Sequence, residues 1–527
     1  MRSLYHSHVQ HSTLALCLTL TGLTCLISAY HLHGRSPSFH IIVAEEDAAR
    51  VAPTEIVAPL EHRPSATISA GGRYMSYMPH SGFHNQRIAL ENALTLAAIL
   101  NRTLLLPPAR LGLKPAIHYA PSDTLWKTLL SAVPTPNASL PEQCSVNPNN
   151  ALWCEPLGDA THLPWHWLVD FQSFGSSFDI WSPAAPSYPW YDGSEPLLAN
   201  DTADFFDTSV YTHRITDTPV EQSKSLGRYS SALDLRVLQN VSARHLRLGS
   251  LFGSARLRFW KPQHIAVRSH VRAHLRIINT VIDSLSSIAV AKLGGPDAYL
   301  AAHVRVNDRQ FESRGGAQAA WFLLVSRLLG GPDNAKAFER HLFNATTASD
   351  EYDLKTYKPA RAIAPRIPEP VPFTTFPSNF SCPRPLHEDA WLSPLNVPLF
   401  LASDARAEDP RLSKFMRTFP CTFTLAELLP FDSAVALPVS ALESLRDFDP
   451  VTSHTLIESG PRVFVRPDQL HSSLDGAPLI SHLAPLLDAH IAAQAITVAG
   501  TPESTFSSHI LDVGWPTAHG RQITQRG

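Results

Sequence analysis

The sequence predicts an α/β fold, because short apolar strands alternate with helical segments along much of the chain. Three stretches carry this expectation. Residues 74–106 read as strand, loop, helix and strand, residues 299–329 as a buried strand followed by a helix, and residues 479–499 as a helix followed by a strand. Strands and helices alternate on both sides of a proline-rich connection, so we expect two Rossmann-like domains.

The first stretch opens with a short strand at residues 74–78, bounded by two glycines and by Pro79. A loop follows it. In this loop Gly82 can take a backbone conformation that is closed to other residues, and Asn85 offers two hydrogen-bond donors and one acceptor. A strand and loop of this kind form the start of a nucleotide-binding βαβ unit, so the loop is a candidate binding site.

A helix is expected next, over residues 88–100. Apolar residues recur there at three- and four-residue spacing, which leaves Arg87 and Glu91 away from the apolar face. The unpaired amide groups of the first turn would face the loop, and a helix end of this kind favours an anion. A second strand at residues 103–106 is stopped by two prolines.

The later part of the chain repeats the alternation. Longer helical patterns at residues 236–251 and 262–285 lead into the second domain. Its expected elements are a strand at residues 299–306, a helix at 317–329, a strand at 398–404, a helix at 479–495 and a strand at 496–499. Asp404 would stand at the end of the middle strand.

The N-terminus contains an apolar segment without charged side chains, close to the minimum length that spans a bilayer. We expect a signal-anchor with the folded part on the lumenal side, and a cleaved signal peptide is the alternative. The expected boundaries are a cytoplasmic tail at 1–12, the apolar segment at 13–30, a stem at 31–65, an N-terminal domain at 66–285 and a C-terminal domain at 286–527 with a proline-rich insertion at 341–397.

Composition limits the partners and the compartment. The 527-residue chain has a formal net charge of −3 and no long run of like charge, which argues against nucleic acid as a partner. Outside the apolar segment lie Cys144, Cys154, Cys382 and Cys421, which allow three disulfide pairings and do not form a zinc pattern. Together with six Asn-x-Ser/Thr triplets, they predict a folded part in the endoplasmic reticulum or Golgi lumen.

Tryptophans are concentrated in the loop-rich region at residues 134–191. They are Trp153, Trp165, Trp167, Trp181 and Trp190. Aromatic side chains of this kind are able to line an acceptor-binding surface. We favour the simpler interpretation for each of them, in which it packs an irregular loop against the first domain.

Three motifs stand in a fixed order: PHSGFHNQR at residues 79–87, YLAAHVRV at residues 299–306 and VAGTPESTFSSHI at residues 498–510. In this order they resemble the motifs of the GDP-fucose protein O-fucosyltransferase superfamily, and the resemblance spans residues 70–511. The resemblance implies a GT-B arrangement, in which two Rossmann-like domains face a cleft that contains the active site.

The resemblance also implies roles for particular residues. Arg305 would stabilise the charge that develops on a departing diphosphate, and His303 would contact the nucleotide or orient Arg305. Asp404 would accept hydrogen bonds from guanine. The expected substrate-binding residues are Gly82, Phe83, Asn85, His303, Arg305, Asp404, Ser504, Thr505 and Phe506. Arg305 is the expected catalytic residue, and no metal or other cofactor is expected.

These motifs have ordinary structural explanations as well. His303 and Arg305 would then be the polar end of a buried strand, while Ser504 or Thr505 would cap a helix and Phe506 would lie in the core. The general base stays open. The opening loop has no carboxylate where some members of the superfamily carry one, so His84 and Asp308 are candidates. The alternative is a reaction that needs little help from a base, because the bond to GDP is largely broken when the acceptor attacks.

The resemblance predicts an inverting glycosyltransferase that moves fucose from GDP-fucose to a Ser or Thr hydroxyl of a secretory-pathway protein. The expected partners are therefore a nucleotide sugar, a protein or glycan acceptor, and the membrane through the N-terminal segment. Two alternatives stay open. One is a transferase for another nucleotide sugar or a glycan acceptor, and the other is an inactive protein that binds sugar nucleotides or glycans.

Overall fold

The computed structural model of the protein describes residues 68–69, 71–112, 119–131, 160–175, 178–183, 188–192, 201–218, 226–307, 311, 315–343, 381–432, 434–438, 441, 457–459, 462–470 and 479–523. All of them belong to one compact unit, Glu61–Gly527. The expected tail, apolar segment and stem lie outside the described residues, as do Cys144, Cys154, Trp153 and Asp308. No helix in the described ranges is both long enough and apolar enough to cross a membrane.

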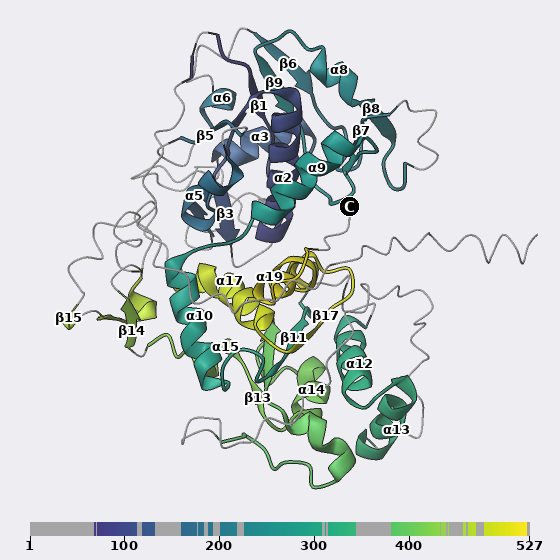
Figure 1. Ribbon diagram of the computed structural model, residues 1–527, viewed down its shortest axis with the longest axis vertical. Helices are drawn as coiled ribbons and strands as arrows, with labels where there is room; N and C mark the ends of the chain where they lie inside the picture. The colour runs from purple at the N-terminus through teal and green to yellow at the C-terminus, as the bar shows by residue number, and fades with distance from the viewer. Residues whose placement is uncertain are drawn as a thin grey trace, which may run out of the picture. The chain divides into compact units, whose positions relative to one another are not determined.

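The first sheet has five parallel strands in the order β5-β2-β1-β9-β6 (Figure 1). These strands are β5 Ile180–Trp181, β2 Thr103–Leu105, β1 Tyr74–Ser76, β9 His245–Leu248 and β6 Thr202–Phe205. The central strand β1 pairs with β2 on one side and β9 on the other, so that Met75 lies opposite both Leu104 and Leu246. Helices α2 (Phe83–Leu100) and α9 (Pro262–His274) pack against each other beside this sheet.

The second sheet has four parallel strands in the order β13-β12-β11-β17. They are β13 Thr422–Phe423, β12 Leu399–Ser403, β11 Leu300–Val304 and β17 Thr497–Gly500. Alternate residues of β11 face opposite ways. Leu300 and Ala302 pack with Trp321 of α12 (Gly316–Leu328), whereas Ala301 packs with Leu483 of α17 (Leu479–Ala493). This sheet is therefore covered by helices on both faces, as expected for buried parallel strands.

Smaller sheets and helices complete the described part. The remaining strands are β3 Ala109–Gly112 paired with β4 Ala160–Leu163, β7 His213–Thr216 with β8 Ser231–Asp234 and β10 Leu257–Arg258, and β16 Arg462–Val465 with β14 Val435–Pro438 and β15 Ile457–Ser459. The remaining α-helices are α3 Ser122–Ser131, α5 Trp165–Leu168, α6 Pro189–Asp192, α8 Leu235–Gln239, α10 Thr280–Lys292, α13 Pro332–Phe343, α14 Ser413–Thr418, α15 Leu425–Leu428, α18 Thr505–His509 and α19 Trp515–Ala518. A π-helical turn, Ile510–Gly514, joins the last two, and 3₁₀ turns occur at Gln172–Phe174, Ala390–Asn396, Pro410–Leu412 and Pro467–Gln469.

Two parallel α/β sheets confirm the fold class that the alternation of elements predicted. The strands and helices expected at residues 299–306, 317–329, 398–404 and 479–499 appear as β11, α12, β12, α17 and β17. Their agreement has a common cause, because fully buried strands and long amphipathic helices give the strongest sequence signals.

Two expected helices are wrong. The pattern at residues 236–251 contains only the short α8, and then β9 enters the first sheet between β1 and β6. Leu246 and Leu248 alternate with two polar residues there, so that pairing on both sides selects the strand. The pattern at residues 262–285 is two helices, since the Asn279 side chain accepts hydrogen bonds from the amides of Val281 and Ile282 and begins α10.

The structure also decides two questions that the sequence left open. Cys382 and Cys421 form a disulfide with their Cα atoms 4.4 Å apart, which ties the segment before α14 to the edge of the second sheet at β13. Trp165, Trp167 and Trp190 are buried in the hydrophobic core, so for these three the interpretation as packing residues is confirmed.

Candidate active site

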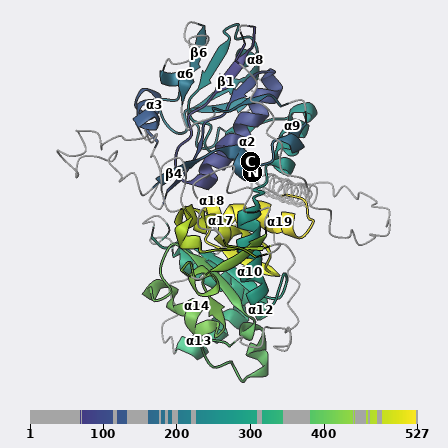
Figure 2. The ribbon, with the colours of Figure 1, turned by 90° about the vertical axis from the view of Figure 1, so that its left-hand side faces the viewer.

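The three sequence motifs meet around one aromatic side chain, Phe506 of α18. Its ring stacks on His303 at the end of β11, with ring centroids 4.3 Å apart. The ring of His84, in the first turn of α2, meets the Phe506 ring edge to face, with centroids 4.6 Å apart. His84 also stacks on His509 of α18, with centroids 4.4 Å apart. Helices α2 and α18 are accordingly neighbours, and α18 is drawn between the two sheets in Figure 2.

His303 is a buried neutral histidine. Burial, and then the nearby Arg305 guanidinium, lower the pKa of His303 to about 3. Its Nδ1 atom lies 2.6 Å from the hydroxyl of Ser507, a residue 204 positions further along the chain. This contact and the stacking on Phe506 fix the ring, so His303 is held as a rigid support at the base of the site.

The loop after β17 holds the end of β11 in place. The amide of Thr501 donates to the carbonyl of His303 at 3.0 Å, and the Thr501 hydroxyl accepts from the amide of Arg305 at 3.0 Å. Gly500 permits a close approach, because a Cβ atom at this position would lie 2.6 Å from the Cβ atom of Ser507. Sequence reasoning missed Thr501 and Ser507, although both stand within the third motif.

Ser504 caps α18, since its side chain accepts a hydrogen bond from the amide of Ser507. This confirms the structural explanation of that residue. Thr505 begins the helix, and Phe506 packs partly buried against the core.

Arg305 is a partly exposed cation in the site. Its Nε atom lies 3.8 Å from Oδ2 of Asp404, and the two side chains are 35% and 29% exposed. Within the described residues that Nε atom has no hydrogen-bond partner. The guanidinium is therefore balanced by one long ion pair, and its fork of donors can bind an anion.

The Asp404 carboxylate accepts hydrogen bonds from the backbone in addition to its ion pair with Arg305. Its Oδ1 atom accepts from the amide of Val306 at 2.8 Å, and both carboxylate oxygens lie near the amide of Asn307. The carboxylate thus closes the turn that follows β11. Recognition of guanine by this residue stays a prediction, and it would have to use lone pairs that the turn leaves unused.

The first turn of α2 differs from the expected loop. The helix begins at Phe83 rather than at residue 88, so Phe83, His84 and Asn85 are helical. Gly82 is the N-cap with an extended backbone, and its carbonyl accepts from the amides of Asn85 and Gln86 at 2.9 and 3.2 Å. Its conformation is one that other residues adopt, so the special backbone conformation expected for this glycine is wrong.

The unusual conformation belongs to Ser81, whose φ is 66°. A Cβ atom on Gly82 would have nothing within 4 Å, so space for a ligand is present beside this residue. Phe83 stacks on Trp165 at 5.4 Å. The Oδ1 atom of Asn85 is buried without a hydrogen-bond partner among the described residues, which makes Asn85 a good candidate for a contact with substrate.

His84 is poorly suited to act as the general base. Burial, followed by electrostatic interaction with the neighbouring Arg87, His303 and Arg305 side chains, lowers the pKa of His84 well below its usual value. Its two ring nitrogens have no hydrogen-bond partner in the described ranges. The imidazole is therefore neutral and a weak proton acceptor near pH 7.

A buried ion cluster supports this end of α2. Glu91 is fully buried and faces Arg87 on its own helix and Arg268 and Arg272 on α9, with nitrogen–oxygen distances of 3.9, 3.4 and 2.8 Å. Arg87 and Glu91 do lie off the apolar stripe, but they are buried against α9 rather than exposed. No local pattern in the sequence indicates this cluster, because Glu91 and its partners on α9 are about 180 positions apart.

No cluster of three or more histidine, cysteine, aspartate or glutamate side chains able to hold a metal ion occurs among the residues that the structure describes.

Comparison with known proteins gives one informative match. No protein-family model matches the chain. A segment of 38 residues is 55% identical to O-fucosyltransferase 30 of Arabidopsis thaliana, and it amounts to 7% of this chain and 8% of that relative. The resemblance to an O-fucosyltransferase is confirmed over this segment. The chain thus matches far less than two thirds of the length of that relative.

The likeness of this chain to solved structures is weaker than the match to O-fucosyltransferase 30. Crystal structures of POFUT1 in complex with GDP-fucose and with GDP are 11% and 10% identical to this chain. The alignments cover 87% of this chain and 98% of each of those chains, with TM-scores of 0.33 and 0.35. TM-scores of this size carry no argument about the fold or the function.

Proposed function

We propose that the protein is an inverting glycosyltransferase that transfers fucose from GDP-fucose to a Ser or Thr hydroxyl of a secretory-pathway protein. The observation that carries the proposal is the position of Arg305. It follows β11 at the carboxyl end of a parallel sheet, and among the described residues its guanidinium has one ion pair, the long one to Asp404. The carboxyl ends of parallel strands are where α/β folds bind nucleotides.

The chemistry of the transfer fits these residues. The acceptor hydroxyl attacks the anomeric carbon of fucose while the bond from that carbon to the diphosphate oxygen breaks. Negative charge then grows on GDP, and Arg305 stabilises it with donors that are in place before the reaction. Attack from the face opposite the leaving group inverts the anomeric carbon. Asn85, His303 and the segment from Ser504 to Phe506 would form the surroundings of the donor in a GT-B arrangement.

A donor panel tests the proposal. The purified protein is incubated with GDP-fucose, GDP-mannose or UDP-galactose, together with secreted proteins and free glycans as acceptors. We expect nucleotide release and a mass increase of one fucose on a protein acceptor with GDP-fucose alone. Transfer from another donor, or to glycans only, would favour a related transferase. Binding of GDP without transfer to any acceptor would favour an inactive binding protein.

We also propose that the reaction needs no divalent metal. Arg305 and the helix ends would carry out the charge stabilisation that a metal supplies in other transferases. Turnover with GDP-fucose should therefore be the same in EDTA as in manganese or magnesium. Loss of turnover in EDTA that manganese restores would contradict this prediction.

The proposed location is the lumen of the endoplasmic reticulum or Golgi, with residues 13–30 as a type II membrane anchor. The disulfide between Cys382 and Cys421 supports an oxidising compartment, because such bonds are rare in the cytosol. A soluble protein whose mature N-terminus follows residues 13–30 would favour a cleaved signal peptide instead.

A further inference from the structure

A buried histidine beside the start of α2 is hydrogen-bonded to a serine through each of its ring nitrogens. His80 Nδ1 lies 2.8 Å from the hydroxyl of Ser81, and His80 Nε2 lies 2.6 Å from the hydroxyl of Ser250. His80 is 4% exposed and Ser250 is 1% exposed, whereas Ser81 is only partly buried. The three side chains form a continuous chain of hydrogen bonds that reaches from the interior towards the surface at Ser81.

Ser81 has a strained backbone. Its φ of 66° lies in the left-handed region, which is uncommon for a residue other than glycine. Such a conformation is energetically unfavourable for a residue with a side chain, and it is concentrated at functional sites. Ser81 directly precedes the N-cap of α2, Gly82, which has open space beside it.

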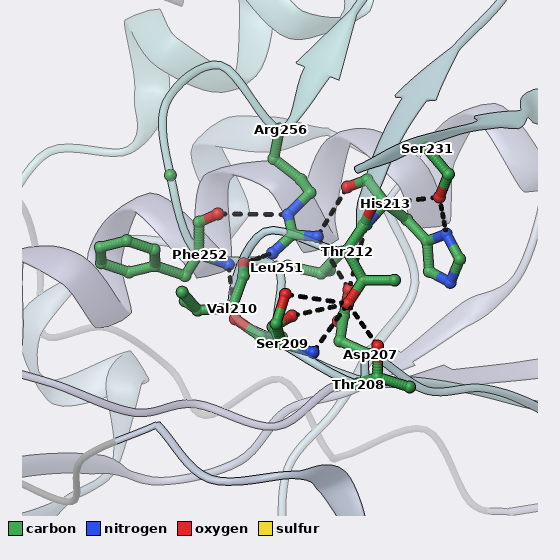
Figure 3. A network of polar contacts seen from close by, with 12 residues as sticks. Asp207, Thr208, Ser209, Val210, Thr212, His213, Ser231, Leu251, Phe252 and Arg256 are labelled. Carbon is green, nitrogen blue, oxygen red and sulfur yellow. Dashed lines mark hydrogen bonds and ion pairs between the residues drawn. The ribbon is translucent and has the colours of Figure 1, made fainter. Parts of the chain in front are cut away.

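The interior end of this chain is firmly held. The amide of Phe252 donates to the Ser250 hydroxyl at 3.1 Å, and Arg256 Nε donates to the carbonyl of Phe252 at 3.2 Å. Arg256 is buried and also pairs with Asp207 at 3.0 Å, as Figure 3 shows. These contacts fix the loop that carries Ser250.

The surroundings of His80 are mainly aromatic. The imidazole lies between the rings of Tyr119 and Phe252, with centroids 5.3 and 5.2 Å away. The charged groups packed behind these elements are Asp207 and Arg256, which neutralise each other, and the Tyr119 hydroxyl donates to the carbonyl of Asp207 at 3.1 Å. The ring is therefore held in place by these aromatic neighbours and by its hydrogen bonds to Ser81 and Ser250.

We propose that Ser81 and His80 form the proton relay that accepts the proton of the acceptor hydroxyl. This inference rests on the proposed function. As the hydroxyl oxygen bonds to the anomeric carbon and GDP departs, its proton passes to Ser81 Oγ, and the Ser81 proton passes to His80 Nδ1. His80 becomes an imidazolium that donates to Ser81 and Ser250, so both hydrogen bonds persist in the charged form. The electron pair of the broken bond leaves with GDP.

Ser81 is the residue that would touch the substrate, and His80 acts through it. In the resting enzyme the relay requires the tautomer with its proton on Nε2, which donates to Ser250 and leaves Nδ1 free to accept from Ser81. The Ser250 hydroxyl already accepts from the amide of Phe252, and its second lone pair can accept from His80. His84, in contrast, has no partner able to stabilise an added proton in the described part of the chain.

Two variants test the relay, with kcat measured at saturating GDP-fucose and acceptor across a range of pH. Ser81→Gly removes the hydroxyl and suits the left-handed backbone, so folding is preserved. Asn101→Gly is its matched control, because Asn101 also has a left-handed φ of 50° but lies at the other end of α2. His80→Gln keeps hydrogen-bonding capacity but cannot take up a proton.

We expect Ser81→Gly to lower kcat by about 10²-fold or more, the usual contribution of general-base catalysis, while its affinity for GDP stays that of the wild type. Wild-type kcat should fall on the acid side, where a proton on His80 blocks the relay, and His80→Gln should have a low kcat without this acid limb. If Ser81→Gly and His80→Gln have the same kcat as Asn101→Gly, or if they lose GDP affinity in proportion to kcat, the relay is overturned. The proposed function is not affected by that result. A wild-type protein that binds GDP but transfers no fucose would overturn the relay and the proposed function together.

Discussion

Replacing Arg305 by alanine is expected to lower kcat/KM for GDP-fucose by about 10²–10³-fold, which is the usual effect of removing one preorganised donor to a developing anion. The expected loss is large because Nε of this guanidinium has no hydrogen-bond partner among the described residues and its one ion pair is long. Initial rates of GDP release, measured with a protein acceptor, give the value directly.

A matched control separates charge in the site from charge on the surface. Arg406 is an exposed arginine in the loop after β12, and Arg406→Ala should leave the rate unchanged. Arg305→Lys should recover only part of the loss, since an ammonium group keeps the charge but not the planar fork that bridges two oxygens. Equal rates for Arg305→Ala and Arg406→Ala would exclude Arg305 from the reaction.

Replacing Glu91 by glutamine is expected to destabilise the folded protein by about 3–5 kcal/mol, the usual penalty for leaving buried charges without their partner. Glu91 is fully buried among Arg87, Arg268 and Arg272, so its loss removes the carboxylate that lies between three guanidinium groups. Denaturant midpoints of the wild type and the variant measure the effect.

Glu408→Gln provides the control, because Glu408 is exposed and its change should leave the midpoint unchanged. The cluster also predicts a direction with pH. Burial would raise the pKa of Glu91, but the three arginines outweigh burial and lower it below its ordinary value. Its contribution to stability is therefore complete above the ordinary glutamate pKa and is lost as the pH falls through the lowered one. A variant as stable as the control would contradict the account of this cluster.

Local patterns were sufficient to predict the central strands of the second sheet and the helices that cover them. Strand β11 and helix α17 have apolar residues at spacings that belong to one kind of element, and they occur where these patterns indicate. The first turn of α2 was missed for a physical reason. Its residues from Phe83 to Arg87 have no apolar period. His84, Gln86 and Arg87 are nevertheless buried, and the rings of Phe83 and His84 contact Trp165 and Phe506.

The candidate site was only partly visible in the sequence. The motifs indicated His303 and Phe506, but their stacking depends on the contact of His303 with Ser507, 204 positions away. The link from His80 to Ser250 spans 170 positions and depends on a loop that Arg256 holds. Contacts of this kind arise when strands from distant segments pair, and no local period reports them.

The most direct test of the central claim is the binding of GDP, measured by titration calorimetry with the wild type, Arg305→Ala and Arg406→Ala. UDP is the comparison ligand in each titration. We predict that the wild type and Arg406→Ala bind GDP in preference to UDP and that Arg305→Ala binds it much more weakly. A wild-type protein that binds neither nucleotide, or an Arg305→Ala variant that binds GDP as tightly as the wild type, would contradict the account.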